Sequence, residues 1–490
     1  MTDHRATETT ADPLTMTATE MLRRYRSGTL SPVAVAEAQL LRMEKVEPSL
    51  NAFQYRAEAA SVLEQARASA ARWQDGSPAG PLDGVPVTIK DLVDVAGWPT
   101  RRGSATSDEV PAAEDSPCVA SLRSAGAILL GKTTTPEFGW KAMTDSPLFG
   151  TTRSPWNLAH SPGGSSGGAA AAHAAGNGTL AQGNDGGGAV RIPASYCGLV
   201  GLKPTFGRVP HVPAPTPFST LGISGPIVRS VADAALMLNV MAQPDPRDWY
   251  GLPCGEAGEG MHDWRGDVRG DVDGLRIAAT SQFGEAEVDP EVRAAFDAAI
   301  DRLEAHGVTV TRLDSLLDPL TPQFHDYWRL GFATLIRDLP AAAREKLDPN
   351  FRRFAEEGEA LDLASFYRGH EARVALGSYF GAFHQDHDIL LTPTTPTTAP
   401  GLDLVYGSPG HDRYRRAVPF TLPFNLTGQP ACSLPCGLTG AGLPVGLQVV
   451  AARHREDLVL RAARLLEELL AFPQPHPALA ASVGRIAADG

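Results

Sequence analysis

The sequence predicts an α/β fold in which helices are layered around one large β-sheet. Runs with strand character alternate with amphipathic helical patterns along the whole chain. The pattern is clearest where a strand, a helix and a second strand follow one another at residues 275–280, 289–306 and 308–313. The chain has 490 residues, 43% of them hydrophobic and 20% charged, so it can bury a large core. That length accommodates two or three ordinary domains or a single large α/β domain.

The first part of the chain predicts helices behind a polar lead-in. Residues 1–14 are polar, and we expect them to be flexible. Residues 15–75 are rich in Ala, Leu, Glu and Arg, with apolar residues at helical spacing. Ser31 followed by Pro32 is typical of a helix start, with Ser31 as the cap and Pro32 in the first turn. We therefore expect the folded part of the chain to begin with helices near residue 15.

Short runs of β-branched and apolar residues predict the strands of the sheet. Residues 84–89 read GVPVTI and lead directly to Lys90, and residues 127–130 are closed by Gly131 and Lys132. Further strands are expected at residues 275–280, 308–313, 389–391 and 445–450.

Residues 149–210 are dominated by Gly, Ser, Ala and Pro, a composition that also occurs in flexible linkers. Bulky apolar residues within this stretch, among them Leu180 and Leu202, argue against a linker. We expect its backbone to pack closely into the core. Residues 315–385 and 456–472 are instead expected to be mostly helical.

The composition excludes several classes of partner. The formal net charge is −13, and no Lys/Arg cluster of the kind that binds nucleic acid is visible. The five cysteines are Cys118, Cys197, Cys254, Cys432 and Cys436. Their spacing fits no zinc site, so we expect reduced thiols in a cytoplasmic protein. The N-terminus has no apolar signal region, and no apolar run approaches the roughly 20 residues of a membrane helix. We therefore expect no nucleic-acid partner, no membrane span and no metal.

Two glycine-rich stretches carry the clearest chemical signal. Residues 163–168 read GGSSGG, and residues 184–193 read NDGGGAVRIP. The second stretch contains four consecutive small residues, Gly186, Gly187, Gly188 and Ala189. A backbone of this kind can turn its N–H groups inward around an anion, which in acyl transfer is the tetrahedral oxyanion. A plain glycine-rich turn is the alternative interpretation.

Two other types of site fit these stretches poorly. A phosphate-binding loop requires Gly-Lys-Ser/Thr after the glycines, and neither stretch has it. Residues 164–168 match the G-x-S-x-G pattern of the α/β-hydrolases, but that pattern requires a strand immediately before it. Residues 157–162 read NLAHSP, which is not typical of a strand.

Together with Lys90, the two stretches resemble the amidase signature family, the Ser–cisSer–Lys hydrolases. Matching segments occur in order at residues 84–91, 131–139, 155–157, 163–168, 183–193, 198–204, 225–233 and 424–448. The resemblance implies one domain over residues 15–490, with a large mixed β-sheet flanked by helices on both faces. It also implies a variable, substrate-side region at about residues 240–385.

The resemblance also implies roles for individual residues. Lys90 is the terminal base of a triad, and Ser165 is a bridging serine held by a cis peptide bond. Position 189 is that of the nucleophilic serine, although the residue here is Ala189. The backbone N–H groups of the four small residues form the oxyanion hole. Residues expected to brace the site are Ser166, Asp185 and Arg191. No metal and no organic cofactor is implied, and a homodimer is left open.

The chemistry supports Lys90 independently. A serine hydroxyl that attacks an amide must lose its proton, and no histidine in the sequence is tied to this site. His173, in an Ala-rich run, is expected to be a surface or packing residue. A lysine can accept the proton if burial lowers its pKa, and the apolar run before Lys90 predicts such burial. The alternative is a strand-end lysine in an ion pair with Asp91.

Ala189 has two interpretations. We interpret it as an engineered replacement of the serine, because relaxed selection would be expected to alter Lys90, Ser165 or the glycines as well. The alternative is a natural pseudoenzyme, a non-catalytic ligand-binding protein of the same fold. The first interpretation predicts an amidase that cleaves a carboxylic amide C–N bond through a serine acyl-enzyme, and that also accepts esters or carbamates as a urethanase.

The residues after position 189 bear on the substrate. The glutaminase subunit of the tRNA-dependent amidotransferase typically reads Arg-Gln-Pro here, whereas this chain reads Arg191, Ile192 and Pro193. We therefore expect a small-molecule amide, as in the bacterial catabolic members of the family. Residues expected to form an apolar pocket are Phe138, Trp140, Met143 and Trp328.

Overall fold

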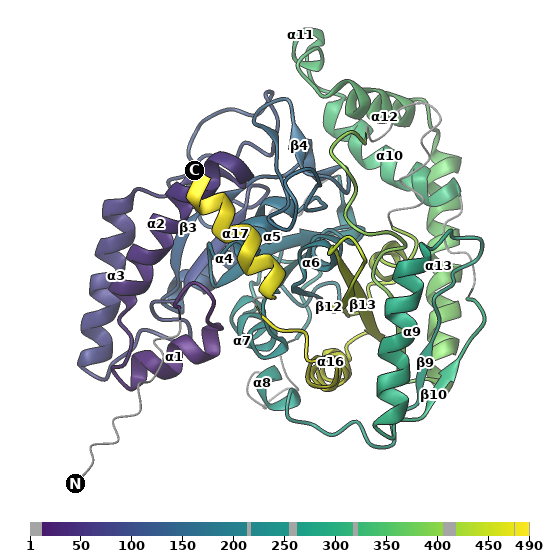
Figure 1. Ribbon diagram of the computed structural model, residues 1–490. Helices are drawn as coiled ribbons and strands as arrows, with labels where there is room; N and C mark the ends of the chain where they lie inside the picture. The colour runs from purple at the N-terminus through teal and green to yellow at the C-terminus, as the bar shows by residue number, and fades with distance from the viewer. Residues whose placement is uncertain are drawn as a thin grey trace.

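A computed structural model shows that one large mixed β-sheet organises the chain (Figure 1). It describes residues 12–212, 217–253, 262–316, 322–404, 418–474 and 476–489. Within these residues the sheet has 11 strands in the order β1-β3-β2-β6-β8-β7-β12-β13-β11-β9-β10. The strands are β1 (Phe53–Arg56), β2 (Pro86–Lys90), β3 (Ile128–Thr133), β6 (Leu180–Asp185), β7 (Val200–Lys203), β8 (Ile223–Val228), β9 (Ile277–Ala279), β10 (Val310–Arg312), β11 (Ile389–Pro393), β12 (Ala431–Leu438) and β13 (Pro444–Ala451). Two short strands, β4 (Asp145–Ser146) and β5 (Gly150–Thr151), pair separately.

Antiparallel pairing occupies the middle of the sheet, parallel pairing lies on either side of it, and the edge strand β1 is again antiparallel to its neighbour β3. Strand β2 runs parallel to both β3 and β6, and β9 runs parallel to both β10 and β11. The strands from β6 through β8, β7, β12 and β13 to β11 pair antiparallel in turn. Since β2 and β6 are parallel neighbours, the segments that follow them emerge at the same edge of the sheet.

Helices cover both faces of the sheet. The longer helices are α1 (Ala18–Arg26), α2 (Pro32–Leu50), α3 (Ala59–Gln74), α4 (Pro117–Ser124), α5 (Gly167–Ala174), α6 (Arg191–Cys197), α7 (Val231–Met241), α9 (Pro290–Ala305), α10 (Pro322–Ile336), α12 (Pro349–Glu359), α13 (Leu363–Asp386), α16 (Glu456–Leu470) and α17 (Pro477–Asp489). The shorter ones are α8 (Trp264–Asp267), α11 (Ala341–Arg344) and α15 (Leu422–Leu426).

Side-chain alternation along the strands divides the core into two layers. In β3, Leu129 packs with residues of α4, α7 and α16, whereas Ile128 and Leu130 pack with α2, α3 and α5 on the other face. Because both faces are covered, the strands read as nearly continuous apolar runs rather than as alternating ones. The prediction of a mixed sheet with helices on both faces is confirmed.

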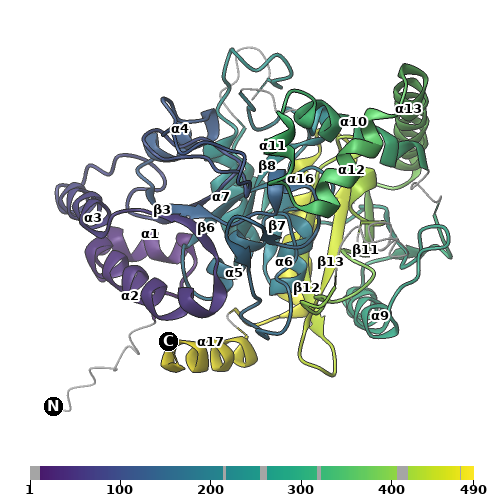
Figure 2. The ribbon, with the colours of Figure 1, turned by 90° about the horizontal axis from the view of Figure 1, so that it is seen from above.

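A third apolar cluster lies at one end of the molecule, opposite helices α1 to α3 (Figure 2). Helices α10, α12 and α13 contribute to it, and Phe332 and Phe351 are completely buried there. Trp140 packs against Phe351 with ring centroids 5.9 Å apart. This contact joins the helical cluster to a segment that follows β3.

Most predicted elements lie where the sequence placed them. Ser31 caps α2 by accepting a hydrogen bond from the Val33 N–H, and Pro32 opens the helix. Residues 149–210 pack into the core, and the residues immediately before Ser165, 152–164, form no strand. The segment at 127–130 is longer than predicted, because β3 continues through Gly131 and Lys132 where β1 pairs with it.

Some expectations differ or cannot be compared. Leu14 is buried, so the described end of the polar lead-in is packed against the fold. Residues 1–11 and Cys254 lie outside the described residues, and the other four cysteines are free thiols. His173 is completely buried, so it is a packing residue and not a surface one. None of the helices described combines the length and the apolar character that crossing a membrane requires.

The close packing of the central strands generates a stability prediction. A methyl group added at Gly225 in β8 would overlap the Leu202 carbonyl oxygen of β7, so Gly225→Ala is expected to destabilise the fold by about 1–3 kcal/mol or more. Gly381 in α13 is exposed with open space around it, so Gly381→Ala should stabilise by about 0.5–1 kcal/mol. Urea unfolding of both variants measures the difference. A neutral Gly225→Ala would contradict the strand packing.

Candidate active site

Lys90 stands at the end of β2, and its amine contacts Ser165. Side-chain alternation places Lys90 on the face opposite Val87 and Ile89, towards the loop that leads into α5. Lys90 is completely buried, and its Nζ donates to Ser165 Oγ at 2.6 Å. A longer bond runs from Nζ to the Asn184 carbonyl oxygen at 3.4 Å.

Burial controls the charge of this amine. It holds the pKa of Lys90 well below the usual range for lysine, and the charge of Asp185 opposes this shift only in part. Asp91 is not its partner within the described residues. The Asp91 carboxylate pairs with Lys132, Nζ to Oδ1, at 2.8 Å. The structure therefore favours an uncharged Lys90 over the ion pair that was the alternative interpretation.

The serine loop is tied to the glycine loop. The peptide bond between Gly164 and Ser165 is cis. Ser166 Oγ donates to the Asn184 carbonyl oxygen at 3.2 Å and accepts from the Asn184 N–H at 3.3 Å. The Ser166 N–H donates to the Ala189 carbonyl oxygen at 3.3 Å. Ser165 and position 189 therefore belong to neighbouring segments held together by main-chain contacts.

The glycine loop supplies fewer free donors than the sequence indicated. The Gly188 N–H donates to Asp185 Oδ1 at 2.7 Å, so it is already engaged, which corrects its expected place in the oxyanion hole. No acceptor within the described part of the chain meets the N–H groups of Gly186, Gly187 and Ala189. These three residues line a cavity and Gly188 does not.

Gly188 has a different task in the loop. Its φ of +127° and its position against Thr421 leave no room for a side chain. Thr421 Oγ1 donates to the Gly187 carbonyl oxygen at 2.7 Å, which holds that carbonyl in place. The glycine at 188 therefore allows the loop to curl tightly.

A buried ion pair fixes the loop from behind. Arg191 Nε and Nη2 each donate to the Asp185 carboxylate at 2.9 Å, and both side chains are completely buried. Burial alone would raise the pKa of Asp185, but the charge and hydrogen bonds of Arg191 outweigh it and hold that pKa well below its usual range. Asn425 and Gln448 accept further hydrogen bonds from Arg191 at 2.6 and 2.7 Å. Asp185 and Arg191 are thus placed as braces.

The loops enclose a cavity of about 240 Å³ with an aromatic side. Of the four residues expected to form an apolar pocket, Phe138, Trp140 and Trp328 line this cavity. Met143 does not, because it lies behind Gly164, where its backbone fills the space beside the cis bond. From the variable region at 240–385, the described residues in the lining are Trp328 and Leu335, both on α10.

Sequence reasoning missed several lining residues. Phe218 packs on Gly186, and its ring centroid lies 5.2 Å from that of Trp328. Arg102 and His211 also line the cavity. All three stand outside the glycine stretches, in loops whose sequence has no motif to mark them. Among the described residues, no three His, Cys, Asp or Glu side chains converge in a way that could hold a metal ion.

Comparison with known proteins identifies the family. A family model described as Amidase matches residues 34–460. The chain belongs to the amidase signature family. The family that the motifs predict is therefore confirmed, and it is a family of amide hydrolases.

Individual members of the family cover nearly the whole chain. An acylamidase of Rhodococcus erythropolis is 38% identical over 94% of this chain and 97% of its own length. A glutamyl-tRNA(Gln) amidotransferase subunit of Synechococcus sp. (strain CC9605) is 35% identical over 92% and 96%. The solved structure of 6-aminohexanoate cyclic dimer hydrolase in complex with its substrate superimposes with a TM-score of 0.85 at 29% identity, over 95% and 99% of the two chains.

The brace in this amidase-family chain generates a second stability prediction. Arg191→Met leaves the Asp185 carboxylate buried without its charge partner, so a loss of about 3–5 kcal/mol is expected. Arg265→Met breaks a pair with Asp263 in which both side chains are half exposed, so it should cost about 1 kcal/mol or less. Urea unfolding measures both. Equal, small losses would show that the buried pair does not hold the loop.

Proposed function

We propose that this fold carries an amide-hydrolase active site that works through an acyl-enzyme at position 189. The observation that carries the proposal is the buried contact between Lys90 Nζ and Ser165 Oγ, beside a loop with free main-chain donors. An uncharged amine next to a hydroxyl is a proton acceptor, and free N–H groups stabilise developing negative charge.

The proposed reaction begins with a serine at position 189. Its Oγ attacks the amide carbonyl carbon, its proton passes to Ser165 Oγ, and the Ser165 proton passes to Lys90 Nζ. The N–H groups of Gly186, Gly187 and residue 189 stabilise the oxyanion. The C–N bond breaks as the amine takes a proton back along the same route. Water then attacks the acyl-enzyme and releases the acid.

Ala189 interrupts this sequence at its first step. Without an Oγ no acyl-enzyme can form, while the cavity, the donors and the Lys90–Ser165 contact are present. We therefore propose that this chain binds an amide without cleaving it. The same structure also suits a protein that only binds a ligand. Restoring the serine distinguishes the two functions, because only the enzyme then hydrolyses an amide.

The cavity supports an apolar amide, ester or carbamate as the substrate. Phe138, Trp140, Phe218 and Trp328 give it an aromatic side that suits an aryl or alkyl group. The similarity to an acylamidase supports the same substrate class. A glutamine-cleaving function is the second candidate, because a glutamyl-tRNA(Gln) amidotransferase subunit is 35% identical. Ile192 on the cavity wall and the aromatic side favour the first.

Restoring the nucleophile tests the proposal. Ala189→Ser is expected to raise the rate of amide hydrolysis by at least about 10⁴-fold, because the remaining parts of the site are in place. Release of aniline from aryl amides and of ammonia from glutamine measures the rate and separates the two candidates. A serine-restored protein that is inert towards both would support the ligand-binding function instead.

Two further variants in the Ala189→Ser background serve as controls. Lys90→Met and Ser165→Ala should each lower kcat by about 10²- to 10⁴-fold, because each breaks the proton route. The double variant should have a kcat no lower than that of the more severe single variant, since the two residues act as one unit. Independent, multiplicative losses would contradict the relay.

The pH profile provides a separate prediction. Burial lowers the pKa of Lys90, so the amine is uncharged and active above that pKa and protonated and inactive below it. The kcat/KM of Ala189→Ser should therefore rise with pH and reach a plateau at neutral to alkaline pH. A substrate without ionisable groups isolates the enzyme's own titration. A flat profile down to about pH 5 would exclude lysine as the base.

A further inference from the structure

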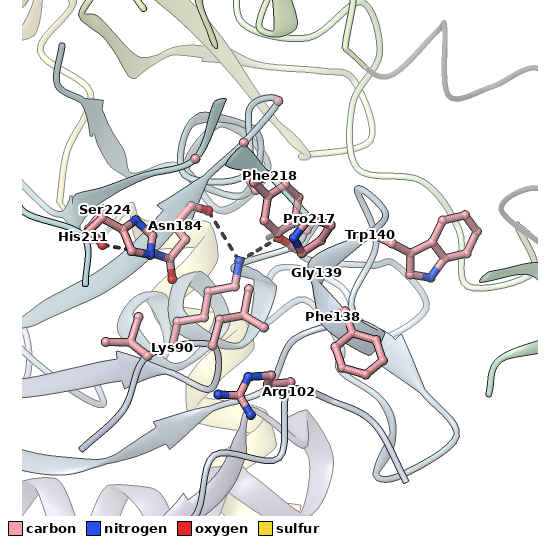
Figure 3. A pocket seen from close by; sticks show the side chains of 18 of the residues that line it. Lys90, Arg102, Phe138, Gly139, Trp140, Asn184, His211, Pro217, Phe218 and Ser224 are labelled. Carbon is pink, nitrogen blue, oxygen red and sulfur yellow. Dashed lines mark hydrogen bonds between the residues drawn. The ribbon is translucent and has the colours of Figure 1, made fainter. Parts of the chain in front are cut away.

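The cavity has a polar side as well as an aromatic one. His211, Asn184 and Ser224 gather on one side of Lys90, and Phe218 and the other aromatic residues lie on the opposite side (Figure 3). Position 189 and the two glycines with free N–H groups line the same cavity as Lys90. The polar side takes no part in the proton route described above.

Asn184 presents an unused acceptor to this side. It lies opposite Ser224 in the antiparallel pair of β6 and β8, and its Nδ2 donates to Ser224 Oγ at 3.0 Å. Gln182 Nε2 donates to the same hydroxyl at 3.1 Å, so Ser224 holds the Asn184 amide in place. The Asn184 Oδ1 atom is buried and has no hydrogen-bond partner within the described residues.

His211 presents a second unused atom. Its backbone N–H donates to Asp248 Oδ2 at 3.1 Å, which fixes the residue in its loop, while its Nδ1 is buried without a partner in the described part of the chain. Burial lowers the pKa of His211 to about 4, and the charge of Asp248 opposes this only in part. At neutral pH the imidazole is therefore uncharged and offers one N–H and one lone pair.

Two unused polar atoms on one side of the cavity indicate a missing ligand group. On the aromatic side, Trp140 Nε1 is a further buried atom without a partner among the described residues. Buried polar atoms without partners are rare, because each loses its hydrogen bonds to water on folding. Among the described residues, the charges near the polar side are opposed. Burial lowers the pKa of Lys90, which favours its uncharged form, and Arg102 at the cavity wall pairs with Asp94 at 3.6 Å. A neutral group therefore suits this side better than a carboxylate or an ammonium.

We propose that Asn184 and His211 form a subsite for a second neutral group of the substrate, one that both donates and accepts hydrogen bonds, as an amide does. The inference rests on the proposed function, which identifies the bond that is cleaved. The cleaved carbonyl uses the glycine donors, so the group at Asn184 and His211 is a different one. The preferred substrates are then apolar amides that carry a second amide-type group.

Three matched ligands test the subsite without any change to the protein. Each ligand is an acetanilide that carries one substituent on its ring, at the meta or the para position. The three substituents are an N-methylcarboxamide, an ethyl ketone in which CH2 replaces the N–H, and a carboxylate. Calorimetry with the Ala189 chain at about pH 8 should show the methylamide binding about tenfold more tightly than either analogue in at least one isomer. Equal affinities for the three, or no binding of any, would overturn the subsite.

Variants of the cavity residues show where the preference for the methylamide arises. Asn184→Leu should bring the methylamide-to-ketone ratio towards one, because it removes the acceptor for the N–H that only the methylamide carries. His211→Phe should weaken the methylamide and the ketone alike, because both keep the carbonyl to which the imidazole N–H donates. Phe138→Leu on the aromatic side should weaken all three ligands and leave the ratio at about tenfold. If Asn184→Leu leaves the ratio unchanged in a folded protein, or His211→Phe leaves both affinities unchanged, the subsite is wrongly placed.

Kinetics separate this inference from the proposed function. In Ala189→Ser, kcat/KM for release of the aniline should show the same tenfold preference. Hydrolysis without preference would overturn the subsite and leave the hydrolase intact. Tenfold selective binding by a serine-restored protein that cleaves nothing would overturn the hydrolase and leave the subsite intact.

Discussion

The complete burial of the Lys90 amine is the constraint on which the rest of the site depends. An exposed lysine is charged at neutral pH and cannot accept a proton, whereas Lys90 is enclosed at the end of β2 and contacts Ser165 Oγ at 2.6 Å. The neighbouring lysine shows the contrast. Lys132 is equally buried but contacts a carboxylate, Asp91, at 2.8 Å, and the charge of that carboxylate opposes the lowering of the Lys132 pKa by burial. Two buried lysines of adjacent strands thus differ in the group beside the amine, a hydroxyl for Lys90 and a carboxylate for Lys132.

The second requirement is a glycine loop that keeps its shape without using up its donors. The Asp185–Arg191 pair meets it by taking only the Gly188 and Val190 N–H groups. Those of Gly186 and Gly187, two residues that line the cavity, meet no acceptor among the described residues. Arg191 in turn bonds to residues far away in the sequence, Asn425 and Gln448. The loop is therefore fixed from the opposite end of the chain as well as by its own residues.

The sequence was informative where chemistry requires fixed residue types in fixed order. Lys90, Ser165 and the glycines could be found in this way, and so could the strands, because buried parallel strands read as apolar runs. Met143 was placed wrongly because an apolar residue near a site looks the same in sequence whether it faces the cavity or the core. The Gly188 N–H was expected in the oxyanion hole, but it donates to the Asp185 carboxylate. That bond depends on how the Asp185 side chain folds back onto the loop, which the sequence does not show. Phe218 and His211 enter the cavity from loops, and only tertiary packing brings them there.

The aromatic side of the cavity and the proton route rest on separate parts of the core. Trp328 and Leu335 come from α10, within the apolar cluster of the helical end, whereas Lys90 is held by the sheet and α5. Changes in the packing of α10 against α12 and α13 can therefore alter the size and shape of the acceptable substrate while the basicity of Lys90 is unaffected. Such a division allows one catalytic framework to be adapted to different amides by repacking a single helical layer.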